Sequence, residues 1–170
     1  IGYIRLTSFD SKSTVKSVRD AVIKVRQQGA QAIILDLRNN TGGLLKNAVA
    51  ISSLFLKKGI IVKIQERGKK KRIYQANGHS IYTQAPLVIL VNKTSASASE
   101  IVAGSLKEHK RAIIVGETTF GKGTIQRLRA LKDGSALLFT AGYYQLPSGT
   151  SIQGTGIKPD RIIELSEEDR

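Results

Sequence analysis

Apolar residues recur along this chain in two rhythms, and each rhythm predicts a different kind of element. Over residues 11–28 they recur every three or four positions, at Val15, Val18, Val22 and Val25. This is the spacing of one helix face, so the pattern predicts a helix here. The same reasoning predicts two more helices, over residues 44–57 and 97–109.

Continuous apolar runs of strand length lie between the helical stretches, at residues 1–6, 32–37, 87–91 and 111–117. The run at 32–37 is apolar at nearly every position, which is typical of a parallel strand covered on both faces. Strands that alternate with helices predict an α/β layered fold.

Two pairs of alternating segments predict antiparallel strands. Residues 60–66 and 71–77 flank a basic turn, and residues 124–131 and 135–146 are joined at Asp133-Gly134. A glycine-rich connection, PSGTSIQGTGIKPD, then leads to a short last strand at 161–165. The chain contains no internal repeat and no low-complexity linker, so we expect one domain over residues 1–170, with antiparallel strands near its C-terminus.

Length and composition agree with one hydrophobic core, since the chain has 170 residues and is 41% hydrophobic. No run approaches the roughly 20 apolar residues that a membrane-spanning helix needs. The first residues show no signal-peptide pattern, and the chain begins with isoleucine inside a strand-like run. We therefore expect a piece of a longer protein whose N-terminus lies outside this sequence.

The inventory of reactive side chains excludes several kinds of chemistry. The chain has no cysteine, which removes disulfides, thiolate nucleophiles and thiolate metal sites. Its two histidines, His79 and His109, are too few for a histidine-based metal cluster. We expect neither a metal nor another cofactor.

The charge balance is strongly basic, with 27 Lys and Arg against 13 Asp and Glu, a net charge of +14. Such an excess is found in proteins that bind nucleic acid or anionic membranes. The densest basic run is residues 67–72, and none of the nine aromatic residues interleaves it as a stacking platform would. We interpret the run as a solvated hairpin tip and expect no nucleic-acid partner. A non-catalytic basic binding domain stays as an alternative.

A near match to a phosphate-binding loop follows the strand at 111–117. Gly116 and Gly121-Lys122 satisfy G-x-x-x-x-G-K, but Gly123 stands where Ser or Thr would bind Mg²⁺. No helix follows at once, although phosphate cradling requires one. A nucleotide-binding module that uses Lys122 is therefore the second alternative.

Ser97 opens the third predicted helix and has two interpretations. With Glu100 it fits the S-x-x-E capping box, which would make it a helix cap. Its neighbours Ala96 and Ala98 are small enough for a substrate backbone to approach. Backbone N–H groups at a helix N-terminus also stabilise a developing oxyanion, which suits a nucleophile.

A serine nucleophile needs a base, and few groups qualify. His109 lies about three turns along the same helix from Ser97, too far to meet it. His79 has no orienting carboxylate near it in sequence. Lys122 lies between glycines that permit close backbone packing, and a desolvated lysine can act as a base. Gln126, four residues on, shares a strand face with Lys122 and would orient its ammonium group.

The segment SASASEIVAGSLKEHKRAIIVGETTFGKGTIQ, residues 95–126, resembles the signature of the C-terminal processing peptidases, also called tail-specific proteases. These are serine peptidases with a Ser-Lys dyad. The segments IGYIRLTSF, LDLRNNTGG and PSGTSIQGTGIKPD follow the family's order as well. The resemblance therefore covers nearly the whole chain and implies a ClpP/crotonase-like fold.

Matched position by position, the resemblance makes Ser97 the nucleophile, Lys122 the general base and Gln126 the support of the lysine. It implies an oxyanion hole made by the backbone N–H of Ala98 and one from Gly42-Gly43.

Two other positions bear on the match. Glu108 falls where some members carry an acidic residue, and an exposed helix-end carboxylate is an equal interpretation of it. Thr94 departs from the family, since many members have glycine there.

The resemblance also implies the setting of the reaction. The substrates would be proteins or peptides with apolar C-terminal tails, cut in an extended conformation. Family members usually carry a PDZ domain just before the segment that corresponds to Ile1, and this chain does not contain one. An extracytoplasmic location is implied, in a periplasm, a cell envelope or a thylakoid lumen. The oligomeric state is left open.

Overall fold

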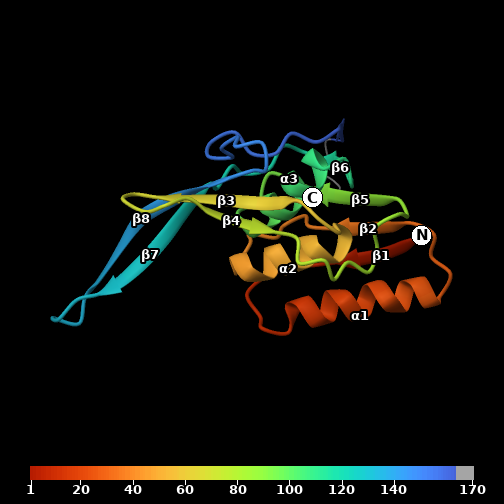
Figure 1. The fold of residues 1–170 in the computed structure, drawn as a ribbon, viewed down its shortest axis with the longest axis horizontal. Coiled ribbons are helices and arrows are strands. Elements are labelled where there is room, and N and C mark those ends of the chain that lie inside the picture. The colour runs from red at the N-terminus through yellow and green to blue at the C-terminus, as the bar shows by residue number, and fades with distance from the viewer. Residues whose placement is uncertain (164–170) are drawn as a thin grey trace, which may run out of the picture.

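Two sheets organise the computed structural model, which describes residues 1–163 (Figure 1). The first sheet is parallel, with the strand order β1-β2-β5-β6-β9. Its strands are β1 (Gly2–Arg5), β2 (Ile33–Asp36), β5 (Leu87–Val91), β6 (Ile113–Gly116) and β9 (Arg161–Ile162). Leu35 in β2 and Ile89 in β5 are fully buried, as the apolar runs predicted.

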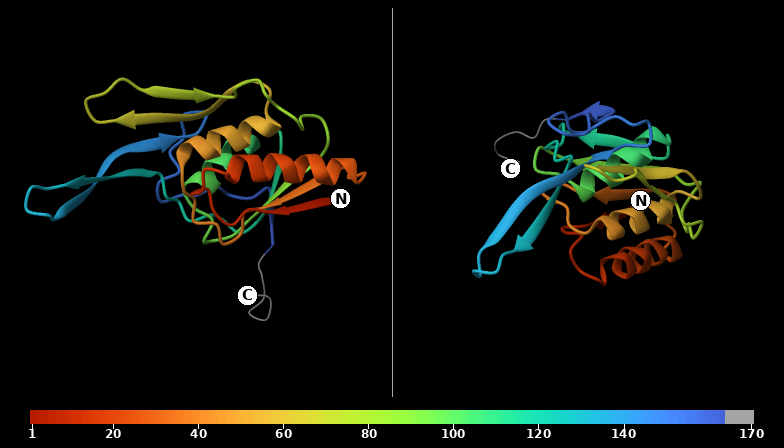
Figure 2. Two further views of the ribbon diagram at one scale, coloured as in Figure 1. Left: turned by 90° about the horizontal axis from the view of Figure 1, so that it is seen from below. Right: turned by 60° about the vertical axis from the view of Figure 1, so that its left-hand side comes forward.

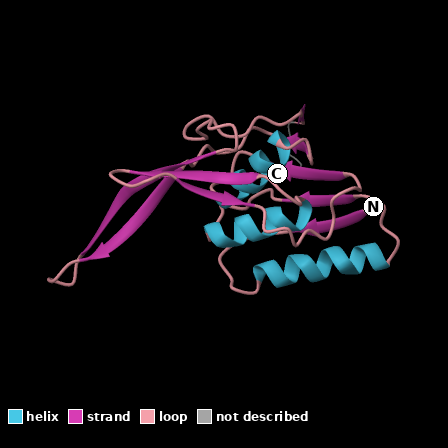
Figure 3. Cartoon of the chain, viewed as in Figure 1, coloured by secondary structure: helices cyan, strands magenta, loops and turns pink. Residues whose placement is uncertain are grey.

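Three helices complete the layers: α1 (Thr14–Gln27), α2 (Leu45–Phe55) and α3 (Ala98–Glu108). Helices α1 and α2 lie side by side along one face of the parallel sheet, and α3 packs against α2 (Figures 1 and 3). Val18 and Val22 bury the inner face of α1, while Ile101, Val102 and Leu106 do so for α3. The helical spacing of these residues is thus explained by one shared core.

The second sheet is antiparallel and has the strand order β4-β3-β8-β7. Its strands are β3 (Ile60–Glu66), β4 (Arg72–Gln75), β7 (Thr124–Ala130) and β8 (Ala136–Gln145). The inner part of β3 is buried against α3, with Ile61, Val62 and Ile64 in the interior. The outer part of the β7–β8 hairpin leaves the body and extends away from it (Figures 1 and 2).

The α/β class predicted from the sequence is confirmed, together with both antiparallel pairs and the basic turn at 67–72. The last strand is shorter than expected, and residues 164–165 of that prediction lie outside the described residues. Within residues 1–163, no helix is long and apolar enough to cross a membrane.

The parallel sheet brings three loops to one edge. Strand β2 leads into residues 37–44, β5 into residues 92–97 and β6 into residues 117–123. Because the carboxyl ends of parallel strands face the same way, these loops meet there, which is where open α/β sheets bind ligands. Gly42, Gly43, Ser97 and Lys122 lie on these loops, Ala98 follows directly, and Gln126 lies in strand β7.

Candidate active site

Ser97 occupies a strained turn between β5 and α3. Its backbone has φ 54° and ψ −110°, a combination that an L-residue with a side chain adopts at a cost of about 1–3 kcal/mol. Strain of this kind persists where the surrounding structure holds it and is concentrated at functional sites. A serine on a sharp strand-to-helix turn also presents its hydroxyl outward at a helix N-terminus. The backbone therefore adds an argument for a nucleophile that the capping pattern lacked.

The capping-box partner of Ser97 does more than cap the helix. Glu100 is fully buried, and its Oε2 accepts the backbone N–H of Ser97 at 2.8 Å and that of Lys122 at 2.9 Å. Its Oε1 accepts the N–H of Gly121 at 2.7 Å and the Thr119 hydroxyl at 2.6 Å. One carboxylate thus fixes the main chain of both proposed dyad residues. The sequence showed Glu100 only as a cap, because its contacts with 119–122 join distant segments.

The glycines beside Lys122 are explained by close packing against the loop 153–156. A Cβ on Gly121 would lie 3.0 Å from the backbone nitrogen of Gly156, and one on Gly123 would lie 2.7 Å from that of Gln153. The Gly123 N–H donates to the Gln153 side-chain oxygen at 2.8 Å. Glycine, and not the Ser or Thr of a phosphate-binding loop, is what this packing requires. Moreover, the loop runs into strand β7, so it lacks the helix N-terminus that cradles phosphate.

The side chain of Lys122 differs from its main chain, because it is exposed. Among residues 1–163, no hydrogen bond or ion pair joins its ammonium group to another residue, Ser97 included. The sequence argument expected a desolvated lysine, and the structure places this one beside an open hollow of about 480 Å³. The hollow is lined by Thr41, Thr94, Ala96, Phe120, Lys122, Thr124 and Gln153.

Within residues 1–163, no hydrogen bond joins the Gln126 side chain to Lys122. A β-bulge lies between Ile125 and Gln126, which shifts the alternation of the strand. The Gln126 amide instead donates to the Thr140 hydroxyl on β8 at 3.0 Å. The four-residue spacing in the sequence did not reveal the bulge.

The proposed oxyanion donors lie around Ser97, and the structure distinguishes between the two glycines. Gly42 packs so closely that a Cβ there would be 2.9 Å from the Ser97 Cβ and 3.0 Å from the Ala98 nitrogen. Its own N–H is already taken, since it donates to Asn40 Oδ1 at 2.9 Å. In the part of the chain that is described, the N–H groups of Gly43 and Ala98 have no acceptor. These two are the donors available to a ligand.

A nucleophile candidate on a strained turn, a lysine beside it and free N–H groups are the parts of a serine peptidase site. The family model described as "Peptidase family S41" matches residues 1–163 of this chain. The chain belongs to peptidase family S41.

Individual S41 relatives are similar over nearly the whole chain. The C-terminal processing peptidase of Tetradesmus obliquus is 42% identical over 168 residues, which is 99% of this chain and 36% of that protein. The carboxyl-terminal-processing protease of Synechocystis sp. is 45% identical over 164 residues, which is 96% of this chain and 38% of that protein. The solved structure of a photosystem II D1 C-terminal processing protease aligns with a TM-score of 0.89 at 41% identity. The alignment covers 95% of this chain and 42% of that one. This chain therefore spans a little over a third of the length of these relatives.

The loop that carries Gly43 in this S41 chain begins next to an ion pair between Arg38 and the buried carboxylate of Asp36. Asp36 is fully buried, and its carboxylate accepts hydrogen bonds from the backbone N–H of Arg38 at 2.9 Å, from the Arg38 guanidinium at 2.7 to 3.1 Å and from the Tyr3 hydroxyl at 2.6 Å. Burial alone would raise the pKa of Asp36, but the hydrogen bonds from Arg38 and Tyr3 outweigh it and leave that pKa below its ordinary value of 3.8. Asp36 is thus held as a carboxylate at neutral pH.

The same loop is tied to the turn before Ser97. Asn39, itself at φ 61°, exchanges hydrogen bonds with Asn92, and its Oδ1 also accepts the Thr94 hydroxyl at 2.8 Å. Asn40 accepts the N–H of Ala96 through its carbonyl at 3.0 Å. Thr94, at the position where the sequence resemblance implies glycine in many members, therefore contributes a contact of its own.

The remaining candidates from the sequence have structural roles. His109 contacts the Ile60 carbonyl at 2.7 Å, away from Ser97, and His79 is exposed. Glu108 accepts both the N–H and the hydroxyl of Ser148 at 2.7 Å, so it anchors the turn before the glycine-rich connection. Across residues 1–163, no group of three acidic or histidine side chains is arranged to hold a metal ion.

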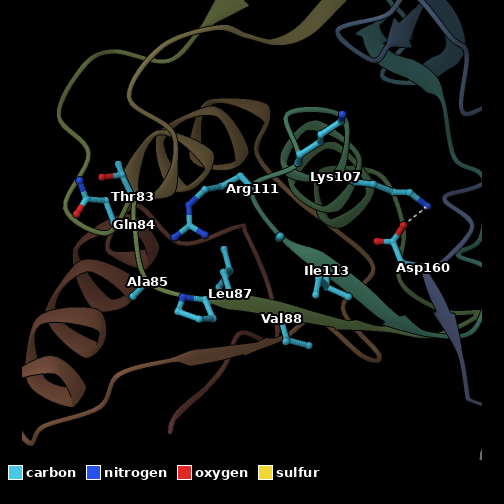
Figure 4. Close-up of a pocket in the computed structure, with 12 residues that line it drawn as sticks. Thr83, Gln84, Ala85, Leu87, Val88, Lys107, Arg111, Ile113 and Asp160 are labelled. Carbon is cyan, nitrogen blue, oxygen red and sulfur yellow. Dashed lines mark ion pairs between the residues drawn. The ribbon is translucent and has the colours of Figure 1, made fainter.

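A second hollow, of about 520 Å³, lies at the opposite end of the parallel strands, where β5 and β6 begin (Figure 4). Leu87 and Ile113 lie on its floor, and Lys107 forms an ion pair with Asp160 at 3.1 Å on one side. Neither Ser97 nor Lys122 lines it.

Proposed function

We propose that this chain is the catalytic core of a serine endopeptidase that cleaves protein C-terminal tails through a dyad of Ser97 and Lys122. The observation that carries the proposal is the carboxylate of Glu100, which binds the main chain of both residues at once. A helix cap alone would not require that link. Family S41 membership and the strained backbone of Ser97 support the same assignment.

In the proposed reaction the neutral amine of Lys122 takes the proton of the Ser97 hydroxyl as its oxygen attacks the scissile carbonyl. The resulting oxyanion accepts hydrogen bonds from the N–H groups of Ala98 and Gly43. Lys122 then gives the proton to the leaving amine, and an acyl-enzyme forms. A water molecule, deprotonated by the same lysine, attacks this ester and releases the new C-terminus with Ser97 restored.

The dyad assembles by movement of one side chain. Because the main chain of Lys122 is fixed, its flexible stem alone must bring Nζ within hydrogen-bond reach of Ser97 Oγ. Substrate in the 480 Å³ hollow would exclude water from the surroundings of the lysine. Gln126 would then exchange its bond to Thr140 for one to the lysine, which keeps it as the proposed support.

The hollow also supports the proposed substrate. Phe120, Ala96 and the methyl groups of Thr41, Thr94 and Thr124 give it a mostly apolar wall, which suits the apolar end of an extended tail. In the longer protein a PDZ domain would engage such tails. The location we propose is extracytoplasmic; matched relatives include proteins named as chloroplastic. The oligomeric state is not part of the proposal.

The test is cleavage of a peptide with an apolar C-terminus, followed by mass spectrometry of both products and of the enzyme. Ser97→Ala and Lys122→Ala should each abolish turnover, with melting temperatures unchanged. Lys57→Ala, which removes another exposed lysine, is the matched control and should retain full activity. Wild-type cleavage that survives in Ser97→Ala would overturn the nucleophile assignment, and survival in Lys122→Ala would overturn the base.

The nucleotide-binding alternative makes a different prediction for the same lysine. Mg-ATP would raise the melting temperature of the wild type and not that of Lys122→Ala. Our proposal expects no shift in either protein.

A further inference from the structure

The outer half of the β7–β8 hairpin is a two-stranded ribbon without a partner in the described chain. It projects from the body in every view (Figures 1 and 2). A two-stranded ribbon is marginally stable in water by itself, and surface leucines are normally scattered. Here five large apolar side chains are exposed within twelve residues: Leu128, Leu131, Leu137, Leu138 and Phe139.

The strand register divides these side chains between both faces of the ribbon. Leu128 pairs with Leu138, and these two are 72% and 63% exposed on one face. Because side chains alternate along a strand, Leu137 and Phe139 lie on the other face, opposite Arg129 and Arg127. A protein partner would cover one face of the ribbon and leave the other in water. A medium that surrounds the tip covers both.

Positive charge accompanies the apolar tip. The two hairpins that project at this end of the molecule, β3–β4 and β7–β8, carry eight Lys and Arg within residues 66–72 and 124–145, against two acidic residues. The two acids are Glu66, which is buried and paired with Lys69, Arg72 and Arg127, and Asp133 at the turn. The uncompensated cations are Arg67, Lys70, Lys71, Arg129 and Lys132.

We propose that the β7–β8 tip, residues 128–138, inserts shallowly into anionic lipid surfaces, with the β3–β4 turn binding headgroups beside it. Apolar side chains flanked by Lys and Arg are the chemistry that binds the interface of an anionic membrane. Arg129 and Lys132 have stems long enough to keep their charges among the headgroups while the leucines enter the acyl boundary.

The ribbon also limits the depth of insertion. Strand β7 is an edge strand, so the backbone groups on its outer side are unpaired and need water or headgroups. The tip must therefore stay within the interfacial layer. Arg127, bound to Glu66 at 2.8 Å, marks the level where the ribbon is fixed to the body.

A single tryptophan tests the proposal directly, since the chain has none. In Leu138→Trp the tryptophan emission should shift to shorter wavelength with phosphatidylglycerol vesicles and stay unchanged with phosphatidylcholine vesicles. Lipids that carry a quencher near the headgroup should quench it more than lipids with a quencher near the chain end. Ile113→Trp, 54% exposed on the body, is the matched control and should not respond.

Two further variants, made in the Leu138→Trp background, separate the contribution of the positive charges to vesicle binding from that of the apolar side chains. Lys70→Ser/Lys71→Ser should weaken vesicle binding about 30-fold, because each cation near an anionic surface contributes about 1 kcal/mol. Leu128→Ser/Leu137→Ser should remove the emission shift while the melting temperature is kept.

Three results would overturn the proposal. The first is the absence of a shift with anionic vesicles, and the second is an equal shift in Ile113→Trp. The third is a shift that depends on protein concentration without lipid, which would assign the ribbon to a second copy of the chain.

Discussion

Residues 119–123 and the β7–β8 hairpin follow one another in the chain and are held in opposite ways. The loop is bound by Glu100 on one side and packs against residues 153–156 on the other, so closely that only glycine fits beside Lys122. In the hairpin, Arg127 of β7 is bound to Glu66 of the neighbouring sheet strand β3, and the leucines farther out are exposed to solvent. Within about five residues the chain passes from the closely packed backbone at Gly123 to the exposed side chain of Leu128.

The difference shows which part of the chain needs a precisely positioned backbone. The proposed peptide chemistry depends on the relative position of Ser97, Lys122 and two N–H groups, and misplacement by about 1 Å costs about 100-fold in rate. An interfacial ribbon depends only on which side chains it carries and how far it reaches. Substitutions in the loop should therefore change activity, and substitutions in the outer part of the hairpin, residues 128–138, should leave it unchanged.

Glu100→Ala should have the largest effect. It leaves three backbone N–H groups and the Thr119 hydroxyl without their acceptor, and we expect kcat to fall about 100-fold. Kinetics on a tail peptide measure it, with a circular dichroism spectrum to confirm folding. Glu108→Ala removes a carboxylate that binds only the Ser148 turn and should change kcat little. Equal losses in both variants would mean that Glu100 acts through general stability.

Glycine substitutions compare the two regions directly. A Cβ on Gly123 would meet backbone at 2.7 Å, so Gly123→Ala should displace the lysine loop and lower kcat by about tenfold. Gly134, at the hairpin turn, has φ +85° and open space around it. Gly134→Ala should therefore cost about 1–3 kcal/mol of backbone strain with unchanged kcat. A drop in kcat for Gly134→Ala would contradict the separation of the two regions.

Asp36→Asn tests the support beneath the Gly43 loop and has a pH signature. The folded-state pKa of Asp36 lies below its unfolded value near 3.8, so its ionisation stabilises the fold above that pH. This stability is lost as pH falls through the folded pKa. Asp36→Asn should cost about 1–3 kcal/mol at pH 7, the scale of hydrogen bonds to a charged group. Denaturant unfolding should show that the difference in the free energy of unfolding between the wild type and Asp36→Asn disappears below about pH 3.8. A difference that stays constant with pH would contradict the assignment.

Leu128→Ala should have the smallest effect, below about 0.5 kcal/mol, because this side chain is 72% exposed. Leu106→Ala, in the buried face of α3, should cost about 2–5 kcal/mol by the same unfolding measurement. A large cost for Leu128→Ala would show that the ribbon packs on something in solution.

Sequence reasoning worked where the signal was local. The helix at α1, the buried run at β2 and the turn at Asp133-Gly134 are patterns within a dozen residues, and all were confirmed. It did not find what depends on distant segments. The bulge after Ile125 redirects Gln126, and the bond from Gly42 to Asn40 leaves Gly43 as the free donor. In the sequence, Glu100 showed only the pattern of a helix cap. Three of its four hydrogen bonds join it to residues 119–122, which are distant in the sequence and outside that pattern.

The free side chain of Lys122 on a fixed main chain has a thermodynamic consequence. When the lysine binds Ser97, the rotamer entropy it gives up is about 2 kcal/mol, equivalent to about a 30-fold change in the population of the assembled dyad. In the proposed dyad, restriction of this one side chain by a bound tail or a neighbouring domain would raise activity by up to that factor with no shift in the backbone.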